Sequence, residues 1–228
     1  MGGRGKRFSK AGCDEPKPFM SVKGAPMFRR ILENIYFENL DQIFVILPQS
    51  QIALARAYAE GLLFAEIIEY IPLVSETRGS AETLLSLDGK IDDEAPFFTI
   101  NCDQLFRRGI EHLAMSFAIS NSDVLIPTFE DSGGSYLMMR CKGSKVECIG
   151  RELEGTKAAA GIYFFRNYRS VRISLSTVCR GDITEGEPCV TEALSLMLAT
   201  GHILETCDIS KDFVSLGTPE LLIHFNQN

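Results

Sequence analysis

The chain has 228 residues, of which 45% are hydrophobic, and its mean hydropathy is +0.04. This length and composition suit one α/β domain, or two small ones, and exclude a chain that is disordered over most of its length. Thirty acidic residues against 23 basic ones give a net charge of −7, which argues against a general nucleic-acid binder because such proteins need surplus cations. No apolar run approaches the roughly 18–20 residues of a membrane-spanning helix, so no membrane partner is expected.

Short apolar runs alternate along the chain with stretches of helical period. Buried strands are expected where β-rich residues run together, at 43–47, 67–71, 97–100, 124–126, 136–139 and 161–165. Helices are expected where apolar residues recur at helical spacing, around 27–35, 51–66, 110–117 and 190–198. This alternation predicts an α/β, Rossmann-like fold with a mostly parallel sheet and helices on both faces. In such sheets ligands bind at the carboxyl ends of the strands.

The seven cysteines include no CxxC pair, and the three histidines show no zinc-type spacing. The basic N-terminus has no apolar stretch behind it, so it does not resemble a secretory signal. These features predict a cytoplasmic protein with reduced thiols, and they disfavour a zinc enzyme or a histidine-based triad.

A glycine-rich, cationic stretch covers residues 2–7 and is followed by Pro16-Lys17-Pro18. Glycines let backbone amides approach phosphate oxygens, and arginine and lysine add positive charge. A flexible basic tail is the structural alternative. Proline on both sides of Lys17 favours the functional interpretation, because it stiffens the backbone and fixes the direction of the lysine.

Asp103 follows the predicted strand 97–100 within Asn101-Cys102-Asp103-Gln104. A carboxylate at the end of a central strand is well placed to hold Mg²⁺ against a triphosphate. The alternative is that Asp103 caps the N-terminus of the following helix, which is the commoner role of an isolated aspartate. Near the end of the chain, Thr218 and Pro219 are explained by a helix start alone.

Taken together, the order and spacing of these segments resemble the sugar-phosphate nucleotidyltransferases, in particular the short bacterial type of capsule or surface-polysaccharide synthesis. The resemblance is carried by seven segments: 1–8, Pro16-Lys17-Pro18 with Val22, Gly24 and Pro26, 77–83, 101–104, 161–165, Gly186-Glu187 and 213–220. The glycine-rich opening and its Pro-Lys-Pro partner are the most specific of these.

The resemblance implies a nucleotidyltransferase or GT-A-like fold in a single domain over 1–228. The implied reaction transfers a nucleotidyl group from an NTP to a sugar 1-phosphate, or a similar phosphate acceptor, and gives an NDP-sugar and pyrophosphate. The implied site consists of Gly2, Gly3, Gly5, Gly79 and Ala81 for the nucleotide, Arg7 and Lys17 for catalysis, Gly161, Glu187 and Arg151 for the sugar phosphate, and Asp103 for Mg²⁺.

The chain departs from the family pattern in three places. The apolar strand that normally precedes the glycine-rich loop is missing from the N-terminus. Ser215 stands where many relatives place a second metal-binding aspartate, with Asp208 or Asp212 as candidate substitutes. The Glu-Lys pair usually found before the Gly-x-Tyr strand is absent, and Arg151 is the candidate replacement for its lysine.

Two other functions stay open. Ser215 and the missing strand favour a binding protein that retains the fold with weakened catalysis. A GT-A-type glycosyltransferase would need a DxD motif, and Asn101-Cys102-Asp103 offers one carboxylate. The sequence leaves open the base, the sugar and whether the protein is a homo-oligomer.

Overall fold

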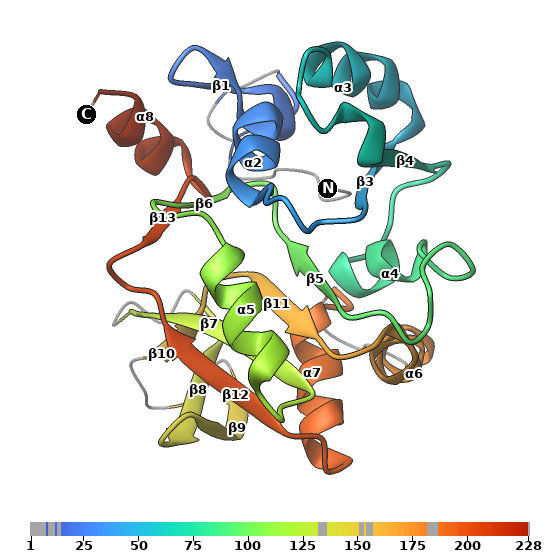
Figure 1. Cartoon of the computed structure of the whole chain (residues 1–228), viewed down its shortest axis with the longest axis vertical. Helices are drawn as coiled ribbons and strands as arrows, with labels where there is room; N and C mark the ends of the chain where they lie inside the picture. Colours follow the sequence, from blue (N-terminus) through green and yellow to red (C-terminus); the bar gives the residue numbers. More distant parts are fainter. Residues whose placement is uncertain are drawn as a thin grey trace. The chain divides into compact units, whose positions relative to one another are not determined.

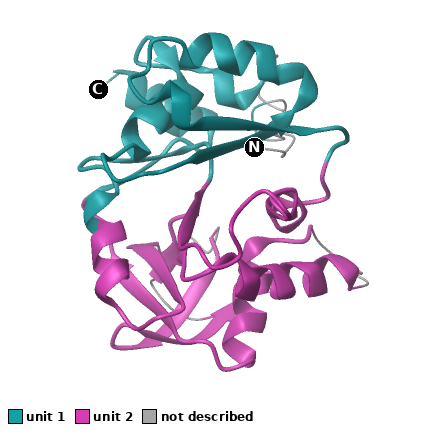
Figure 2. Ribbon diagram, turned by 45° about the vertical axis from the view of Figure 1, so that its right-hand side comes forward, with its two compact units in different colours: residues 1–76, 101–112, 212–228 teal, residues 77–100, 113–211 magenta. Residues whose placement is uncertain are grey.

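The computed structural model describes residues 8, 12, 15–131, 136–150, 153, 157–181 and 187–227. Strands of mixed pairing and helices alternate along the chain (Figure 1). The chain divides into two compact units, coloured separately in Figure 2. Unit 1 contains residues 1–76, 101–112 and 212–228, and unit 2 contains 77–100 and 113–211. The single domain with a missing N-terminal strand stays a prediction.

Unit 1 is built from short strand pairs and helices. Its strands are β1 (Ser21–Val22), β2 (Ala25–Pro26), β3 (Ile43–Pro48), β4 (Ile68–Leu73), β6 (Gln104–Phe106) and β13 (Phe213–Ser215). Its helices are α2 (Met27–Ile35), α3 (Ile52–Ala59) and α8 (Pro219–Gln227), with 3₁₀ turns η1 (Lys17–Phe19), η2 (Gln49–Gln51) and η3 (Ala65–Ile67). The pair β3–β4 is parallel, and the pairs β1–β2 and β6–β13 are antiparallel.

The apolar pattern of unit 1 explains its core. Ile43, Val45 and Leu47 alternate along β3 and are all buried, as expected for a strand with a period of two residues. On α2, Ile31 and Ile35 are buried one turn apart. These buried side chains contribute to the hydrophobic core of unit 1.

Unit 2 contains a seven-stranded sheet in the order β10-β8-β9-β12-β7-β11-β5. Its strands are β5 (Phe97–Ile100), β7 (Val124–Glu130), β8 (Met138–Lys142), β9 (Lys145–Gly150), β10 (Lys157–Ala159), β11 (Ile162–Phe165) and β12 (Leu204–Asp208). Its helices are α4 (Ser80–Leu85), α6 (Tyr168–Arg180) and α7 (Val190–Ala199), together with most of α5 (Glu111–Ile119). Because β10 pairs with both β8 and β7, the strands β7, β10, β8, β9 and β12 close into a five-stranded ring.

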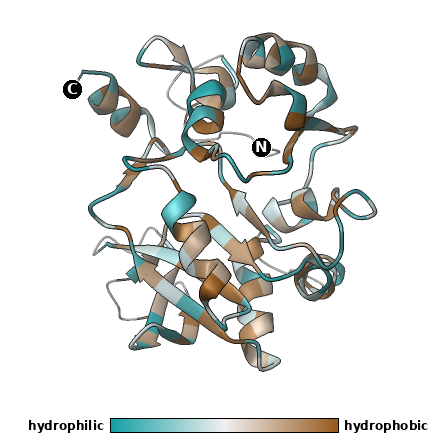
Figure 3. Cartoon of the chain, in the orientation of Figure 1, coloured by the Kyte–Doolittle hydropathy of each residue, from teal (hydrophilic) through white to brown (hydrophobic). Residues whose placement is uncertain are grey.

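Aromatic side chains fill the core of unit 2 beside β11. All four residues of β11 are buried. The rings of Phe97 and Phe165 stack with their centroids 5.0 Å apart, and those of Phe98 and Phe164 lie 5.5 Å apart. Figure 3 shows that β11 and α7 carry mostly hydrophobic residues. This packing fixes the position of β5, whose carboxyl end leads to Asp103.

The expectation of a mostly parallel sheet is wrong. Among the described strands, the parallel pairs are β3–β4 and β7–β12, and the other pairings are antiparallel. The sequence analysis did not detect the strands β1, β2, β6, β9, β10, β12 and β13. Of these, β9 follows its antiparallel neighbour β8 through a short turn. Short turns join antiparallel strands, whereas parallel strands need a longer crossover. The strands therefore alternate less regularly with helices than the sequence pattern indicated.

Several predicted elements are confirmed, including the strands at β3, β5 and β11 and the helix α7. The helix expected over 51–66 is shorter, because α3 ends at Ala59. Gly61 has a φ of +79°, a left-handed backbone that ends the helical path. Within the described ranges, no helix has both the length and the apolar character needed to cross a membrane.

Candidate nucleotidyltransferase site

In unit 1, Lys17 forms an ion pair with Asp103 through Nζ and Oδ2. Lys17 begins η1, directly after Pro16, and the buried Pro18 and Phe19 anchor this turn in the core. The side chains of Lys17 and Asp103 are only 17% and 18% exposed, so solvent screens the pair weakly. The two residues lie 86 positions apart in the chain, and the fold brings them together.

The backbone around Asp103 is held by the strand pair β6–β13. The N–H of Leu216 donates a 2.7 Å hydrogen bond to the Asp103 carbonyl, directly beyond the pair Gln104–Ser215. Strand β6 begins at the next residue, and α5 begins only at Glu111. The alternative role of Asp103 as a helix N-cap is therefore wrong.

The Asp103 carboxylate keeps one acceptor unused. Its Oδ1 atom is buried and has no hydrogen-bond partner among the described residues. A buried carboxylate oxygen without a donor is costly, so this atom is a natural ligand for a cation or a polar group of a substrate.

Gly217 lies close to this carboxylate. A Cβ atom on Gly217 would lie 3.3 Å from both Asp103 Oδ2 and Ser215 Oγ. The Gly217 N–H donates a 3.3 Å hydrogen bond to Ser215 Oγ, which turns the serine hydroxyl toward the same place. The next residues behave as the sequence predicts, because Thr218 Oγ1 accepts from the Leu221 N–H at the start of α8.

This arrangement fits a divalent cation such as Mg²⁺. Magnesium in phosphate-transfer sites is typically held by one or two carboxylates together with substrate phosphates and water. The buried Oδ1 of Asp103, which has no hydrogen-bond partner among the described residues, meets that requirement. In the part of the chain that the structure describes, no three His, Cys, Asp or Glu residues gather to hold a metal ion. Any cation here would rely strongly on its substrate ligands.

Asp212 is engaged elsewhere. This buried carboxylate accepts a 2.8 Å hydrogen bond from the Arg108 N–H, and its Oδ2 lies 3.4 Å from Arg108 Nε and 3.8 Å from His112 Nε2. The Arg107 N–H donates to the Asp212 carbonyl just beyond the far end of β6. Arg107 follows Asp103 by four residues, which corresponds to about 13 Å along a strand. Asp212 therefore does not share an ion with Asp103.

Asp208, the other candidate substitute, belongs to unit 2 at the end of β12. Its carboxylate accepts hydrogen bonds from the Ser210 hydroxyl and the Ser210 N–H at 2.5 and 2.9 Å. These hydrogen bonds hold the pKa of Asp208 below its usual value. The local turn with Ser210 accounts for this side chain.

Cys102 precedes Asp103 in the same segment. Burial raises the pKa of the Cys102 thiol, and the negative charge of Asp103 raises it further. The thiol is therefore protonated at neutral pH and is a poor nucleophile.

In unit 2, the loop with Gly79 and Ala81 contacts the segment that contains Glu187. The Ala81 N–H donates a 3.0 Å hydrogen bond to the Pro188 carbonyl. A Cβ atom on Gly79 would lie 2.3 Å from that same carbonyl oxygen, so only glycine allows this approach. The backbone of Gly79 is extended, with φ of −174°, and its small size rather than an unusual torsion is what matters.

The predicted sugar strand lies in the same unit. Gly161 has a φ of +74°, which turns the chain between β10 and β11. Burial strongly raises the pKa of Tyr163, and the nearby Cys189 adds to this shift. The Cys189 thiol donates a 3.1 Å hydrogen bond to the Glu187 carbonyl. The structure thus places Tyr163, Cys189 and Glu187 in one neighbourhood of unit 2.

The structure brings together Lys17 and Asp103 in unit 1, and Gly79 and Ala81 with the Glu187 segment in unit 2. The other predicted site residues lie outside the described residues: Gly2, Gly3, Gly5, Arg7 and Arg151. The sequence analysis missed the place of Gly217 beside Asp103. The Ser-x-Gly spacing before Thr-Pro was the available signal, but a helix start explained it equally well.

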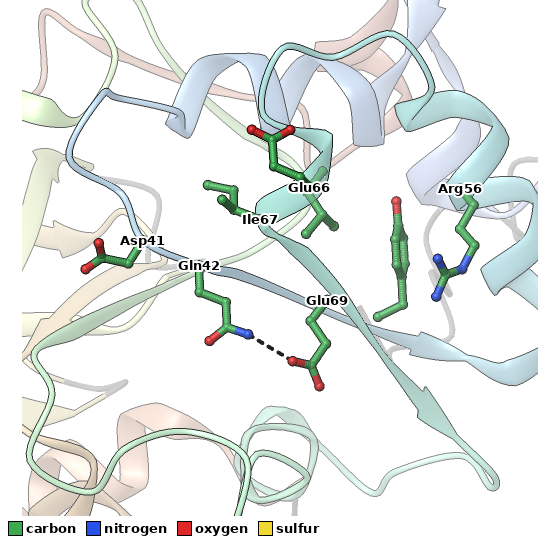
Figure 4. Close-up of a pocket in the computed structure, with 8 residues that line it drawn as sticks. Asp41, Gln42, Arg56, Glu66, Ile67 and Glu69 are labelled. Atoms are coloured by element: carbon green, nitrogen blue, oxygen red, sulfur yellow. Dashed lines mark hydrogen bonds between the residues drawn. The ribbon is translucent and has the colours of Figure 1, made fainter.

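A separate hollow of about 430 Å³ lies beside the amino ends of β3 and β4 (Figure 4). It is lined by Asp41, Gln42, Arg56, Glu66, Ile67, Ile68, Glu69 and Tyr70. Gln42 donates a 2.9 Å hydrogen bond to Glu69, and the Arg56 guanidinium lies 4.5 Å from the centre of the Tyr70 ring. None of the predicted site residues lines this hollow.

Comparison with known proteins agrees with this fold. The family of MobA-like NTP transferase domains matches residues 1–169. No curated protein matches the chain. Three solved structures share its fold at low identity, and each covers 99% of this chain.

The nucleoside-diphosphate-sugar pyrophosphorylase from Vibrio cholerae RC9 has a TM-score of 0.83 at 17% identity, with 97% of that chain covered. The putative glucose-1-phosphate thymidylyltransferase from Bacillus anthracis, in complex with a sucrose, has a TM-score of 0.78 at 17% identity, with 91% covered. The inositol-1-phosphate CTP transferase from T. maritima has a TM-score of 0.74 at 15% identity, with 94% covered.

The fold is therefore that of α/β nucleotidyltransferases, with mixed sheets. The chain belongs to the family of MobA-like NTP transferase domains, because the match extends over residues 1–169 of its 228.

Proposed function

We propose that the protein transfers a nucleotidyl group from an NTP to a sugar 1-phosphate and releases pyrophosphate. The observation that carries the proposal is the Lys17–Asp103 pair, in which Asp103 Oδ1 is buried and has no hydrogen-bond partner among the described residues. A cation held by the Asp103 carboxylate would offset the repulsion between the phosphates of the NTP and of the acceptor. The family match and the fold of the solved structures support the same reaction class.

Lys17 acts on phosphate charge in this proposal. The acceptor phosphate and the α-phosphate of the NTP are both anions and repel each other on approach. An ammonium held by η1 at the site lowers this repulsion and stabilises the charge that builds up in the transition state. The acceptor oxygen attacks the α-phosphorus, and the bond to pyrophosphate breaks. The protein contributes mainly position and charge.

Asp103 and the glycine-rich stretch are the other groups that we assign to the phosphates. When bound at Asp103, Mg²⁺ would supply charge neutralisation at the phosphates. We assign Gly2, Gly3 and Gly5 to the nucleotide and Arg7 to the departing pyrophosphate, on the family resemblance.

The base and the sugar are assigned to segments of unit 2. Gly79 and Ala81 would contact the nucleotide, and their loop is held by the Pro188 carbonyl. Gly161 and Glu187, together with Arg151, would bind the sugar phosphate. Tyr163 is buried near Cys189, whose thiol donates to the Glu187 carbonyl.

Pyrophosphate release from each NTP, measured with a panel of sugar 1-phosphates and Mg²⁺, tests the proposal. Wild-type protein should release pyrophosphate with at least one pair of substrates. Asp103→Asn keeps the shape of the side chain and should lower turnover by roughly 100-fold or more. Glu38→Gln removes an exposed carboxylate of the same unit and should leave turnover unchanged.

The competing functions give other results. Nucleotide binding without pyrophosphate release from any pair would favour the catalytically weakened binding protein. Hydrolysis or transfer of sugar from an NDP-sugar would favour a glycosyltransferase. Full turnover of Asp103→Asn would show that the site is misassigned.

A further inference from the structure

The Lys17 ammonium has a second contact besides Asp103. Its Nζ atom lies over the ring of Phe8, 5.2 Å from the ring centre. Phe8 is a core residue of unit 1, with only 2% of its surface exposed. A cation within about 6 Å of the centre of an aromatic face is attracted by the negative potential of that face. Lys17 is therefore held by a carboxylate and by a ring at once.

The backbone at Lys17 does not fix the ammonium by itself. The η1 turn is anchored by the buried Pro18 and Phe19, and the Phe19 ring lies 5.7 Å from that of Tyr58. Beyond this anchor, a flexible four-carbon stem separates the ammonium from the backbone, and ordering such a side chain costs rotamer entropy. The position of the ammonium therefore depends on the groups that it contacts.

The two contacts act differently on the charge of Lys17. The Asp103 carboxylate carries a full negative charge, so it offsets the positive charge that the proposed reaction needs at the phosphates. The Phe8 ring has no net charge, so it attracts the ammonium and leaves that charge in place. An ammonium that leaves Asp103 for a phosphate oxygen can keep its contact with the ring.

We infer that Phe8 is a positioning residue for Lys17, because the face of its ring holds the ammonium at the site without neutralising it. The contact itself rests on the geometry of these two residues. Its effect on turnover rests on the proposed function, in which Lys17 stabilises charge on the phosphates. The alternative is that Phe8 only fills space in the core, as most buried phenylalanines do.

Fluorinated phenylalanines at position 8 separate these two roles, because fluorine weakens the negative potential of the ring face and changes the shape of the ring little. The full chain is prepared with mono-, di- and trifluorophenylalanine in place of Phe8. For pyrophosphate release, kcat and kcat/KM should fall together with each added fluorine, by about tenfold over the series. A side chain that only fills space would give the same kcat throughout.

The same series at Phe28 is the matched control. Phe28 is as deeply buried as Phe8 in the same unit, and its ring packs edge to face against Phe19. Fluorination at this position should leave kcat unchanged. Circular dichroism confirms that every fluorinated protein is folded.

The motion of the Lys17 side chain tests the contact without any reaction. Relaxation of ¹³C at the ε-carbons of labelled lysines gives an order parameter for each lysine, and Lys17→Met identifies the Lys17 signal by its loss. The order parameter of Lys17 should fall with each fluorine at position 8 and stay constant along the series at position 28. That of Lys142, an exposed lysine of β8, should stay constant in both series.

The outcomes separate this inference from the proposed function. If Lys17 becomes more mobile along the Phe8 series while no NTP and sugar 1-phosphate react, the contact stands and the proposed reaction fails. A constant order parameter of Lys17 overturns the inference even where kcat falls, because Phe8 then acts through another group. A constant kcat along the Phe8 series of an active protein also overturns it.

Discussion

The N–H of Leu216 donates a hydrogen bond of 2.7 Å to the carbonyl oxygen of Asp103. This contact extends the antiparallel pair β6–β13 by one step and places the turn around Gly217 next to the Asp103 carboxylate. Two segments separated by more than 100 residues thereby form one small polar site. The site depends on backbone pairing as much as on the identity of its side chains.

Lys17→Met should lower turnover by roughly 100-fold or more, since the ammonium is assigned to transition-state charge. The loss should be equal for every NTP that the protein accepts, because phosphates carry no information about the base. Steady-state pyrophosphate release with several NTPs measures it. Lys142→Met, at an exposed position of β8, is the control. A change in base preference would contradict the assignment of Lys17 to phosphate.

Gly79→Ala should destabilise the protein and weaken nucleotide binding. The added Cβ would lie 2.3 Å from the Pro188 carbonyl oxygen, so the two loops must separate. Overpacking of this kind costs about 1–3 kcal/mol of unfolding free energy. Urea denaturation measures the change. Gly181→Ala, whose Cβ would make ordinary contacts of 3.6 Å or more, should have little effect. Equal stability of the two variants would show that the loop tolerates the side chain.

Asn34 should prove important for the position of β6. Its side chain both donates to the Phe106 carbonyl and accepts from the Phe106 N–H, each at 2.8 Å. Asn34→Ala removes both bonds and should cost about 2–3 kcal/mol. Asn34→Asp keeps the acceptor but turns a carboxylate oxygen toward a carbonyl oxygen, and it should also destabilise the protein. Thermal melting with Gln42→Ala as an exposed control compares them, and unchanged melting would refute the role of Asn34.

Tyr168 should make stability fall at high pH. Burial, reinforced by the negative charge of Asp88, raises its pKa to about 12 from the usual 10. The unfolded chain therefore loses the phenol proton first, and the free energy of unfolding falls as pH rises from 10 to 12. The slope from this group approaches about 1.4 kcal/mol per pH unit.

Tyr168→Phe should show a shallower decline over the same range in urea denaturation. Tyr36→Phe, which changes a more exposed ring, should decline as the wild type does. Identical slopes for Tyr168→Phe and the wild type would mean that the Tyr168 phenol ionises equally easily in both states.

Local features of the fold follow from the sequence alone. The apolar runs at β3, β5 and β11 were predicted because uninterrupted β-rich residues favour buried strands. The helix start at Thr218 was predicted because a cap depends on a single residue type. The order of the glycine-rich, Pro-Lys-Pro and Asn-Cys-Asp segments was enough to indicate the family, and the family match confirms it.

Only the tertiary structure excluded the helix-cap role of Asp103, and its role as a metal ligand stays a prediction. An aspartate after a strand reads equally well as a helix cap or as a ligand, and the difference depends on the short strand β6, which forms only by pairing with β13. The contact of Gly79 with Pro188 and the closure of five strands in unit 2 arise in the same way. Hydrophobic periodicity records which residues are buried along one element. It does not record which distant backbone supplies the hydrogen bonds, and those long-range pairings fix the position of Asp103, with which Lys17 pairs.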